Sequence, residues 1–320
     1  MVDFAKKLKE KPGEQVLGNQ VLDTTGAPPA TTNGGALVTA TTDDDLAAYA
    51  GAGNEHVRIE DVKTPFLMVL QSGSPECKKS HSKYVPGAEE GMLMHGLTKH
   101  LYDGRYGVEA IDVFFDPLVN RWVPRNEGSG GGFRGSFPPG DPRLKQLMEQ
   151  AKPNPKNELV FDLPDKTQLV NANNHYLLVR PYVLPEHAAA GELPAHDWTP
   201  VVLSLSSTQI KKSRELNALI GLEKVRNAAG QLVPIPRFGI VWRITTVPES
   251  NAQGSWFGVK FERLRRVEKE ELYASVGFHK MLAAGERRAD MSELDRGDDA
   301  GVVAGTAREV KVGADGKPLV

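Results

Sequence analysis

Alternation of apolar and polar positions is the strongest signal in the middle of the chain. Residues 107–116 alternate in this way, which predicts a half-buried strand that ends at Asp116-Pro117. Short apolar runs bounded by turn residues predict further strands. These runs are 64–74, 90–104, 120–125, 158–163, 174–184, 199–207, 237–249 and 255–266. The last two are joined by a polar stretch and are expected to form a hairpin.

Helical spacing of apolar positions occurs in three segments, 142–151, 207–222 and 267–289. The first has Pro142 in its first turn, where proline is favoured. In the second, Ser206 or Ser207 is expected to cap the helix and Gly221 to end it. The apolar positions of this helix that should face the core are Ile210, Leu216, Leu219 and Ile220.

Composition divides the chain into three parts. Residues 1–56 are rich in Thr, Gly, Ala and Pro and bury too little apolar surface to offset ordering entropy, so we expect a flexible arm. Residues 57–288 hold the predicted strands and helices and are expected to form one domain. Residues 289–320 are expected to form a flexible tail. Because strands predominate without regular βα alternation, we predict an α+β fold with an antiparallel sheet or an OB-like β-barrel.

Overall charge is nearly balanced. The 320 residues include 39 Lys and Arg against 41 Asp and Glu, which gives a formal net charge of -2 and excludes a uniformly basic nucleic-acid binder. Locally, residues 205–270 carry an excess of Lys and Arg. The only cysteine is Cys77, so no intrachain disulfide is expected. We find no apolar stretch that would span a membrane and no signal-peptide core at the start.

Common enzyme signatures are absent from the sequence. We find no P-loop, GxSxG, HExxH or dinucleotide-binding glycine motif, and therefore expect no catalytic site, no metal and no cofactor. One enzymatic alternative is a metal-dependent nuclease. Its support is three acidic residues that could share one site, Asp103, Asp112 and Asp116.

Cations and aromatic residues alternate in several predicted strands and loops, and this combination points to single-stranded nucleic acid. Cations neutralise phosphates, while aromatic rings stack on bases with little sequence preference. The candidate phosphate contacts are Lys78, Lys79, Lys83, Arg121, Arg125, Arg134, Lys211, Lys212 and Arg214. The candidate stacking residues are Tyr84, Trp122, Phe133 and Phe137.

A structural explanation competes with this functional one at several positions. Trp122 alternates with polar residues, as a core residue would, and the glycines of 128–132 are typical of a hairpin tip. The cations of 211–214 are equally compatible with a solvated helix face. Phe133 and Phe137 are predicted to lie in a Gly/Pro-rich loop, where burial is harder, so they are the stronger functional candidates.

Several motifs resemble a group of bacteriophage proteins described as single-stranded-DNA-binding proteins of replication and recombination. The resemblance covers about 64–285 and includes LYDG, the segment STQIKKSRELNALI and GSWFGVK. It implies an OB-like barrel, a non-enzymatic role, a location in the host cytoplasm, and partners among phage replication or recombination proteins. In many such proteins an acidic tail ends the chain, whereas here the acidic patch Glu293–Asp299 is internal.

The resulting hypothesis is a protein that coats single-stranded DNA during phage DNA replication or recombination, with no membrane partner and with homo-oligomerisation left open. A second hypothesis is a virion or assembly protein. It rests on the low-complexity arm of residues 1–56, because such arms often bind neighbouring subunits.

Overall fold

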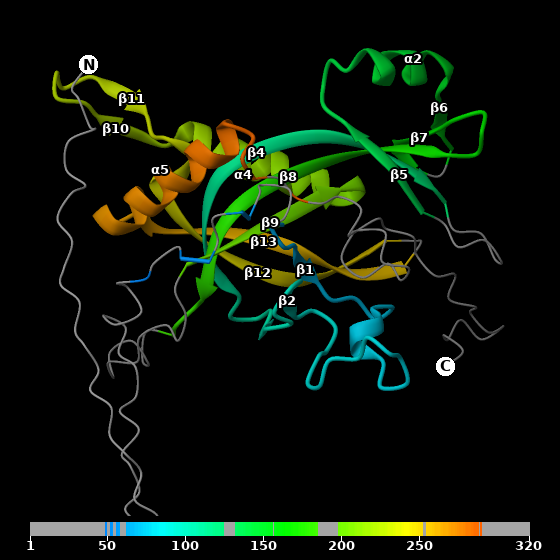
Figure 1. Ribbon diagram of the computed structural model, residues 1–320, viewed down its shortest axis with the longest axis horizontal. Coiled ribbons are helices and arrows are strands. Elements are labelled where there is room, and N and C mark those ends of the chain that lie inside the picture. Colours follow the sequence, from blue (N-terminus) through cyan, green and yellow to red (C-terminus); the bar gives the residue numbers. More distant parts are fainter. Residues whose placement is uncertain are drawn as a thin grey trace, which may run out of the picture. The chain divides into compact units, whose positions relative to one another are not determined.

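The computed structural model describes residues 62–124, 132–155, 157–184, 198–251 and 254–287, together with Tyr49, 52–53, 56–57 and Ala289 (Figure 1). The chain divides into two units, Met1–Glu55 and His56–Val320, and the fold below is that of the second unit. The arm and tail predicted from composition lie almost wholly outside the described residues. In the described part, no helix is long and apolar enough to cross a membrane.

Two long antiparallel strands form the centre of the main sheet. Strand β4 (Val108–Val123) pairs with β8 (Gln168–Pro181) from one end to the other. On its other edge, β4 pairs with β12 (Ile240–Asn251) at one end and with β5 (Gly132–Phe137) at the other. In the same way, the other edge of β8 pairs with β9 (Thr199–Ser206) and with β7 (Asn157–Asp162). Strand β13 (Gly254–Arg266) and strand β6 (Lys152–Asn154) complete an eight-stranded sheet that curls into a half-barrel.

Smaller elements attach to this sheet. Strands β1 (Leu67–Val69), β2 (Leu93–His95) and β3 (Leu101–Tyr102) form a three-stranded sheet, and β10 (Lys224–Arg226) pairs only with β11 (Leu232–Pro234). The α-helices in the described residues are α2 (Pro142–Gln150), α4 (Ile210–Leu222) and α5 (Lys269–Ala283). Short 3-10 turns are η2 (Pro75–Cys77), η3 (Ser207–Gln209) and η4 (Arg237–Gly239).

The apolar core lies on both faces of the main sheet. On one face, side chains such as Ala110 and Leu177 pack against the β1–β3 sheet, while α4 packs against Trp242 of β12. On the opposite face, Ile111 and Tyr176 pack against α5. We call these the α4 face and the α5 face. The prediction of an α+β fold on an antiparallel sheet is confirmed, and the curled sheet is compatible with an OB-like fold.

The structure corrects three local predictions. Strand β4 does not end at Asp116-Pro117 but runs through Pro117. Pro117 lies between the segments that pair with β12 and β5, where β4 has a partner on one edge only, and such a position tolerates the missing N–H. The Gly/Pro-rich segment with Phe133 and Phe137 is strand β5 rather than a loop.

The third correction concerns helix α4. A 3-10 turn that begins at Ser207 precedes it, no side chain caps its first turn, and it continues past Gly221 to Leu222. Leu219 was expected to face the core but is 36% exposed, whereas Ser213 is buried in its place. The apolar spacing alone therefore gave the wrong helix face at these two positions.

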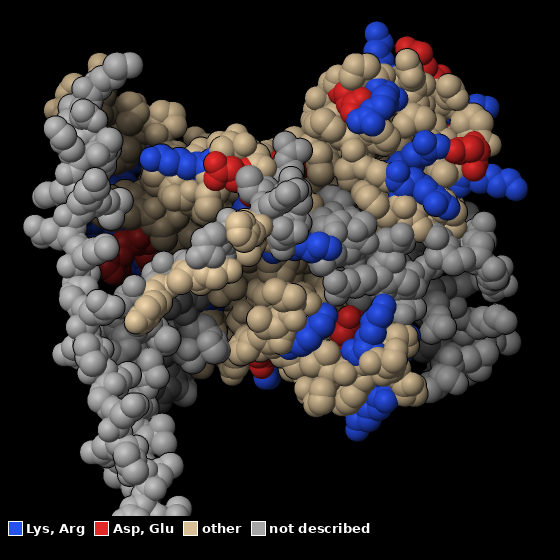
Figure 2. Space-filling model, viewed as in Figure 1, with Lys and Arg blue, Asp and Glu red and all other residues tan. Residues whose placement is uncertain are grey.

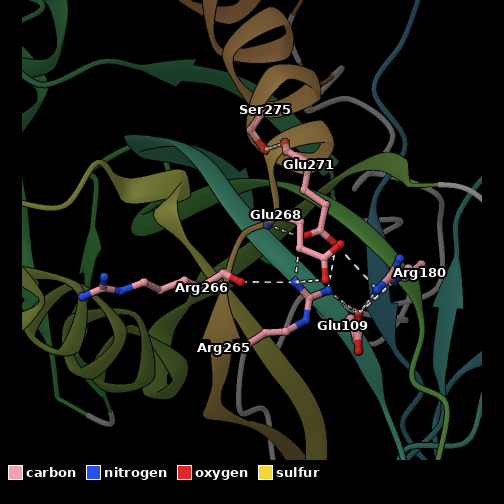
Figure 3. Close-up of polar contacts among 7 residues, drawn as sticks. All are labelled: Glu109, Arg180, Arg265, Arg266, Glu268, Glu271 and Ser275. Carbon is pink, nitrogen blue, oxygen red and sulfur yellow. Dashed lines mark hydrogen bonds and ion pairs between the residues drawn. The ribbon is translucent and has the colours of Figure 1, made fainter. Parts of the chain in front are cut away.

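A cluster of ion pairs attaches the start of α5 to the sheet (Figure 3). Arg265 donates to both carboxylate oxygens of Glu271 at 2.7 Å, and Arg180 lies between Glu109 and Glu271. The Glu271 carboxylate also accepts from the backbone N–H of Glu268, which closes a capping box. Burial alone would raise the pKa of Glu271, but the hydrogen bonds from Arg265 and Glu268 hold that pKa below its usual range.

Replacing this carboxylate tests the role of the cluster. We expect Glu271→Gln to lower the free energy of unfolding at pH 7 by about 1.5–3 kcal/mol, the range for a hydrogen bond to a charged group. Because the folded-state pKa lies below the ordinary value of about 4.3, the stabilisation is complete above that pH and is lost as pH falls through the folded-state pKa. Urea unfolding at several pH values should therefore show the wild type and the variant converging in acid.

Glu270→Gln is the matched control, because Glu270 is an exposed carboxylate in the same helical turn. It should change stability by less than about 0.5 kcal/mol. An equal effect of the two substitutions would contradict the assignment.

Candidate nucleic-acid interface

The predicted nucleic-acid-binding residues fall into three groups in the structure. One group lies on β4 and β5, one on the loop that contains η2, and one on α4. Arg125 lies outside the described residues. Figure 2 shows Lys and Arg side chains both on the lobe built from β5, β6, β7 and α2 and on the η2 loop.

The first group, which we call the β4–β5 ledge, comprises Arg121, Trp122, Phe133 and Arg134. Trp122 lies directly opposite Phe133 in the β4–β5 ladder, and the two half-buried rings meet edge to face with centroids 5.2 Å apart. The ladder shifts register at this point, which leaves Arg134 exposed between Phe133 and Gly135. Two aromatic rings and an exposed guanidinium are thus brought together by strand pairing.

Arg121 is engaged within the protein at the base of the ledge. Its Nε donates to Thr167 Oγ1 at 2.9 Å, and its Nη2 is paired with Asp165. Hydrogen bonds from Thr167 and from Arg121 lower the pKa of Asp165. These contacts orient Arg121 and use part of its donor capacity.

Phe137 has a different environment from Phe133. It is only 8% exposed, and the guanidinium of Arg143 lies 5.5 Å from its ring centroid. Arg143 is in turn held by Asp141, which caps α2. The exposed aromatic surface of the ledge therefore comes from Trp122 and Phe133.

The α5 face becomes polar next to the ledge. Apolar residues such as Tyr176 and Val202 are followed along β8 and β9 by Asn174, Ser204 and Ser206. The hydroxyls of Ser204 and Ser206 are buried and have no hydrogen-bond partner in the described part of the chain. Because both hydroxyls are buried, they are not accessible to a nucleic acid bound at the surface.

The second group lies on the η2 loop. Lys78, Lys79 and Lys83 are exposed, and Tyr84 is half-buried. The loop is anchored by Glu76, whose carbonyl accepts from the N–H of Val85 at 3.0 Å. This arrangement displays the three ammonium groups to solvent.

The third group lies on α4, where two of its three cations are exposed and one is paired within the protein. Lys211 and Arg214 are exposed, whereas the Lys212 ammonium pairs with Glu249 of β12 at 3.2 Å. Glu249 also accepts from Gln209 and from the indole N–H of Trp256, both at 2.9 Å. Lys212 thus helps to attach the helix to the sheet.

A buried polar chain beneath α4 was not predicted from the sequence. His175 Nδ1 lies 2.8 Å from Asp112 Oδ2, and His175 Nε2 lies 2.8 Å from Ser213 Oγ. Because the Asp112 carboxylate only accepts, we assign the proton to Nδ1, so that the Ser213 hydroxyl donates to Nε2. Asn173 donates to the same hydroxyl oxygen at 2.8 Å, and Arg237 pairs with Asp112.

A β-bulge makes this chain possible. The register between β4 and β8 shifts between Asp112 and Phe114, so Asp112 and Phe115 both lie on the α4 face beside His175. Ser213, His175 and Asp112 have the residue types of a hydrolase triad. Since Ser213 and His175 are 0% exposed, we interpret the chain as a structural link between α4 and the sheet.

The three aspartates of the nuclease alternative are separated by this arrangement. Asp103 pairs with Arg105 at a turn, and Asp112 belongs to the buried chain on the α4 face. Asp116 lies farther along β4, opposite Asn174 of β8. Within the described residues, no three His, Cys, Asp or Glu side chains are grouped as metal ligands would be.

Comparison with known proteins adds one finding. A family model described as Pam3 phage gp34-like protein matches residues 32–288, a range that includes every strand and helix above. The chain belongs to this gp34-like family. The family is named for a phage protein, which places the chain among bacteriophage proteins. No curated protein and no solved structure matches the chain.

The polar chain of this gp34-like protein can be tested through its hydroxyl. Ser213→Ala removes the donor to His175 and the acceptor for Asn173, and we expect it to lower the free energy of unfolding by about 1–3 kcal/mol. Glu215→Ala is the control, because Glu215 is exposed on the same helix. Denaturant titrations of both variants should differ by that amount, and equal stabilities would refute a linking role for Ser213.

Proposed function

We propose that this phage protein binds single-stranded DNA during replication or recombination, as a non-enzymatic protein of the host cytoplasm. The observation that carries the proposal is the β4–β5 ledge, where Trp122 and Phe133 lie beside the exposed Arg134. Single-stranded DNA offers unpaired base faces and regularly spaced phosphates, so its binding needs this combination of side chains.

The lobe around the ledge supports the proposal through its exposed cations. Lys145 of α2, Lys152 of β6 and Lys166 of the β7–β8 turn are exposed, as is Arg134. Two acidic groups of the lobe are already engaged, since Asp141 pairs with Arg143 and Asp165 with Arg121, while Glu149 of α2 is exposed. The remaining positive charge can attract a phosphate backbone to the aromatic rings.

The curled antiparallel sheet also supports the proposal, because OB-like barrels bind oligonucleotides on the face of a sheet. In the proposed complex, bases stack on the ledge and phosphates contact Arg134 and the lobe lysines. The η2-loop lysines Lys78, Lys79 and Lys83 supply further phosphate contacts. Phage replication or recombination proteins are the partners that such a role implies.

A salt-dependent titration with fluorescent oligo-dT tests the function directly. Phosphate contacts release counterions, so the logarithm of the binding constant should fall linearly with the logarithm of salt concentration, by about 0.7 per phosphate contacted. Weak binding that does not respond to salt would exclude single-stranded DNA as the ligand.

Substitutions in the ledge locate the site. Phe133→Ala should weaken oligo-dT binding by about 1–3 kcal/mol, the contribution of one stacked base. Arg134→Ala should reduce the salt exponent by about 0.7. Tyr273→Ala is the control, because Tyr273 is an aromatic residue of α5 that is 63% exposed. If Phe133→Ala keeps both its fold and its full affinity, the DNA binds elsewhere.

A further inference from the structure

The β10–β11 hairpin projects from the body beyond α4 (Figure 1), and its two strands have little burial. Only Val225 and Val233 are half-buried, and every other residue of its two strands is exposed. The turn is tied by the side chain of Asn227, which bonds the backbone and side chain of Gln231. A two-stranded hairpin with so little burial contributes little to the core.

The exposed face of this hairpin is basic and apolar. Lys224 and Arg226 point to the same side of β10, and the register places them opposite Pro234 and Leu232. No Asp or Glu occurs between Lys224 and Pro248 in the sequence. At the base, exposed Arg266 donates to the carbonyl of Lys224 at 3.2 Å. A partner of this face should therefore be anionic.

Two features argue against a protein strand or single-stranded DNA at this face. Pro234 lacks an N–H, and the β10 cations oppose strand addition, so both hairpin edges are poor templates for a further strand. The segment 222–236 contains no aromatic residue, so it offers no ring on which an unpaired base could stack.

Duplex DNA fits the remaining chemistry. The major groove of B-DNA, about 12 Å wide, admits a two-stranded β-ribbon, and cations on the ribbon contact the flanking phosphates without any need for stacking. Leu232 can make an apolar contact at the groove floor, as apolar side chains do with thymine methyl groups.

We propose that the β10–β11 hairpin binds the duplex part of a junction between double-stranded and single-stranded DNA. The proposal rests on the function proposed above, because the single strand of the same DNA is held at the β4–β5 ledge. The preferred substrate is then a tailed duplex rather than either form alone.

Three fluorescent DNAs test the proposal: dT20, a blunt 20-base-pair duplex, and that duplex carrying a dT20 tail. The wild-type protein should bind the tailed duplex more tightly than dT20, with a salt exponent larger by about 0.9 for each of Lys224 and Arg226. Lys224→Ala/Arg226→Ala should lose this increment while its affinity for dT20 is unchanged.

The matched control is Lys260→Ala/Lys280→Ala, which removes the same charge from two exposed positions outside the hairpin. It should retain the preference for the tailed duplex. Circular dichroism should show closely similar melting for both double variants, because all four side chains are exposed and Arg226 loses only its hydrogen bond to the carbonyl of Gly230.

The possible failures are distinguishable. Absence of dT20 binding would overturn the single-stranded DNA function itself. Normal dT20 binding without a preference for the tailed duplex, or a preference that survives Lys224→Ala/Arg226→Ala, would overturn the hairpin proposal alone.

Discussion

The pairing of β4 with β8 is the constraint on which the rest of the structure depends. Both strands are longer than any partner on their outer edges, so each shares that edge between two shorter strands. Sheet twist accumulates along such long strands, which curls the sheet and gives it two distinct faces. One end of the pair presents the faces covered by α4 and α5, while the other end presents the β4–β5 ledge.

The β-bulge in the β4–β8 pair also determines how α4 is attached to the sheet. It places Asp112 on the same face as His175, and these two polar side chains receive Ser213 of the helix. A buried polar row destabilises the fold unless its groups find partners, so it favours one position of the helix over others. Apolar packing by Leu216 and Ile220 alone would tolerate a shift of the helix along the sheet.

The sequence predicted the fold class and most elements because period-2 alternation survives wherever one strand face is buried. It missed the continuation of β4 through Pro117, since local turn propensity cannot show that a proline faces an unpaired edge. The sequence analysis also missed the buried hydrogen bonds that connect Asp112, His175 and Ser213, because these residues are distant in sequence. One pattern in the sequence does point to them. Asn173 and His175 precede Leu177 at intervals of two residues, so in a strand these two polar side chains lie on the same face as an apolar core residue.

The structure shows which of the cations in the sequence are already paired with carboxylates. Arg121, Lys212 and Arg265 look alike in a count of cations, yet each is paired with a carboxylate in the structure. Exposed cations remain in several places, and two of these differ in their chemistry: the ledge has aromatic rings beside its cation, and the β10–β11 hairpin has none. Stacking needs unpaired bases, whereas phosphate contact does not. The DNA that we propose as the ligand would therefore be single-stranded at the first surface and paired at the second.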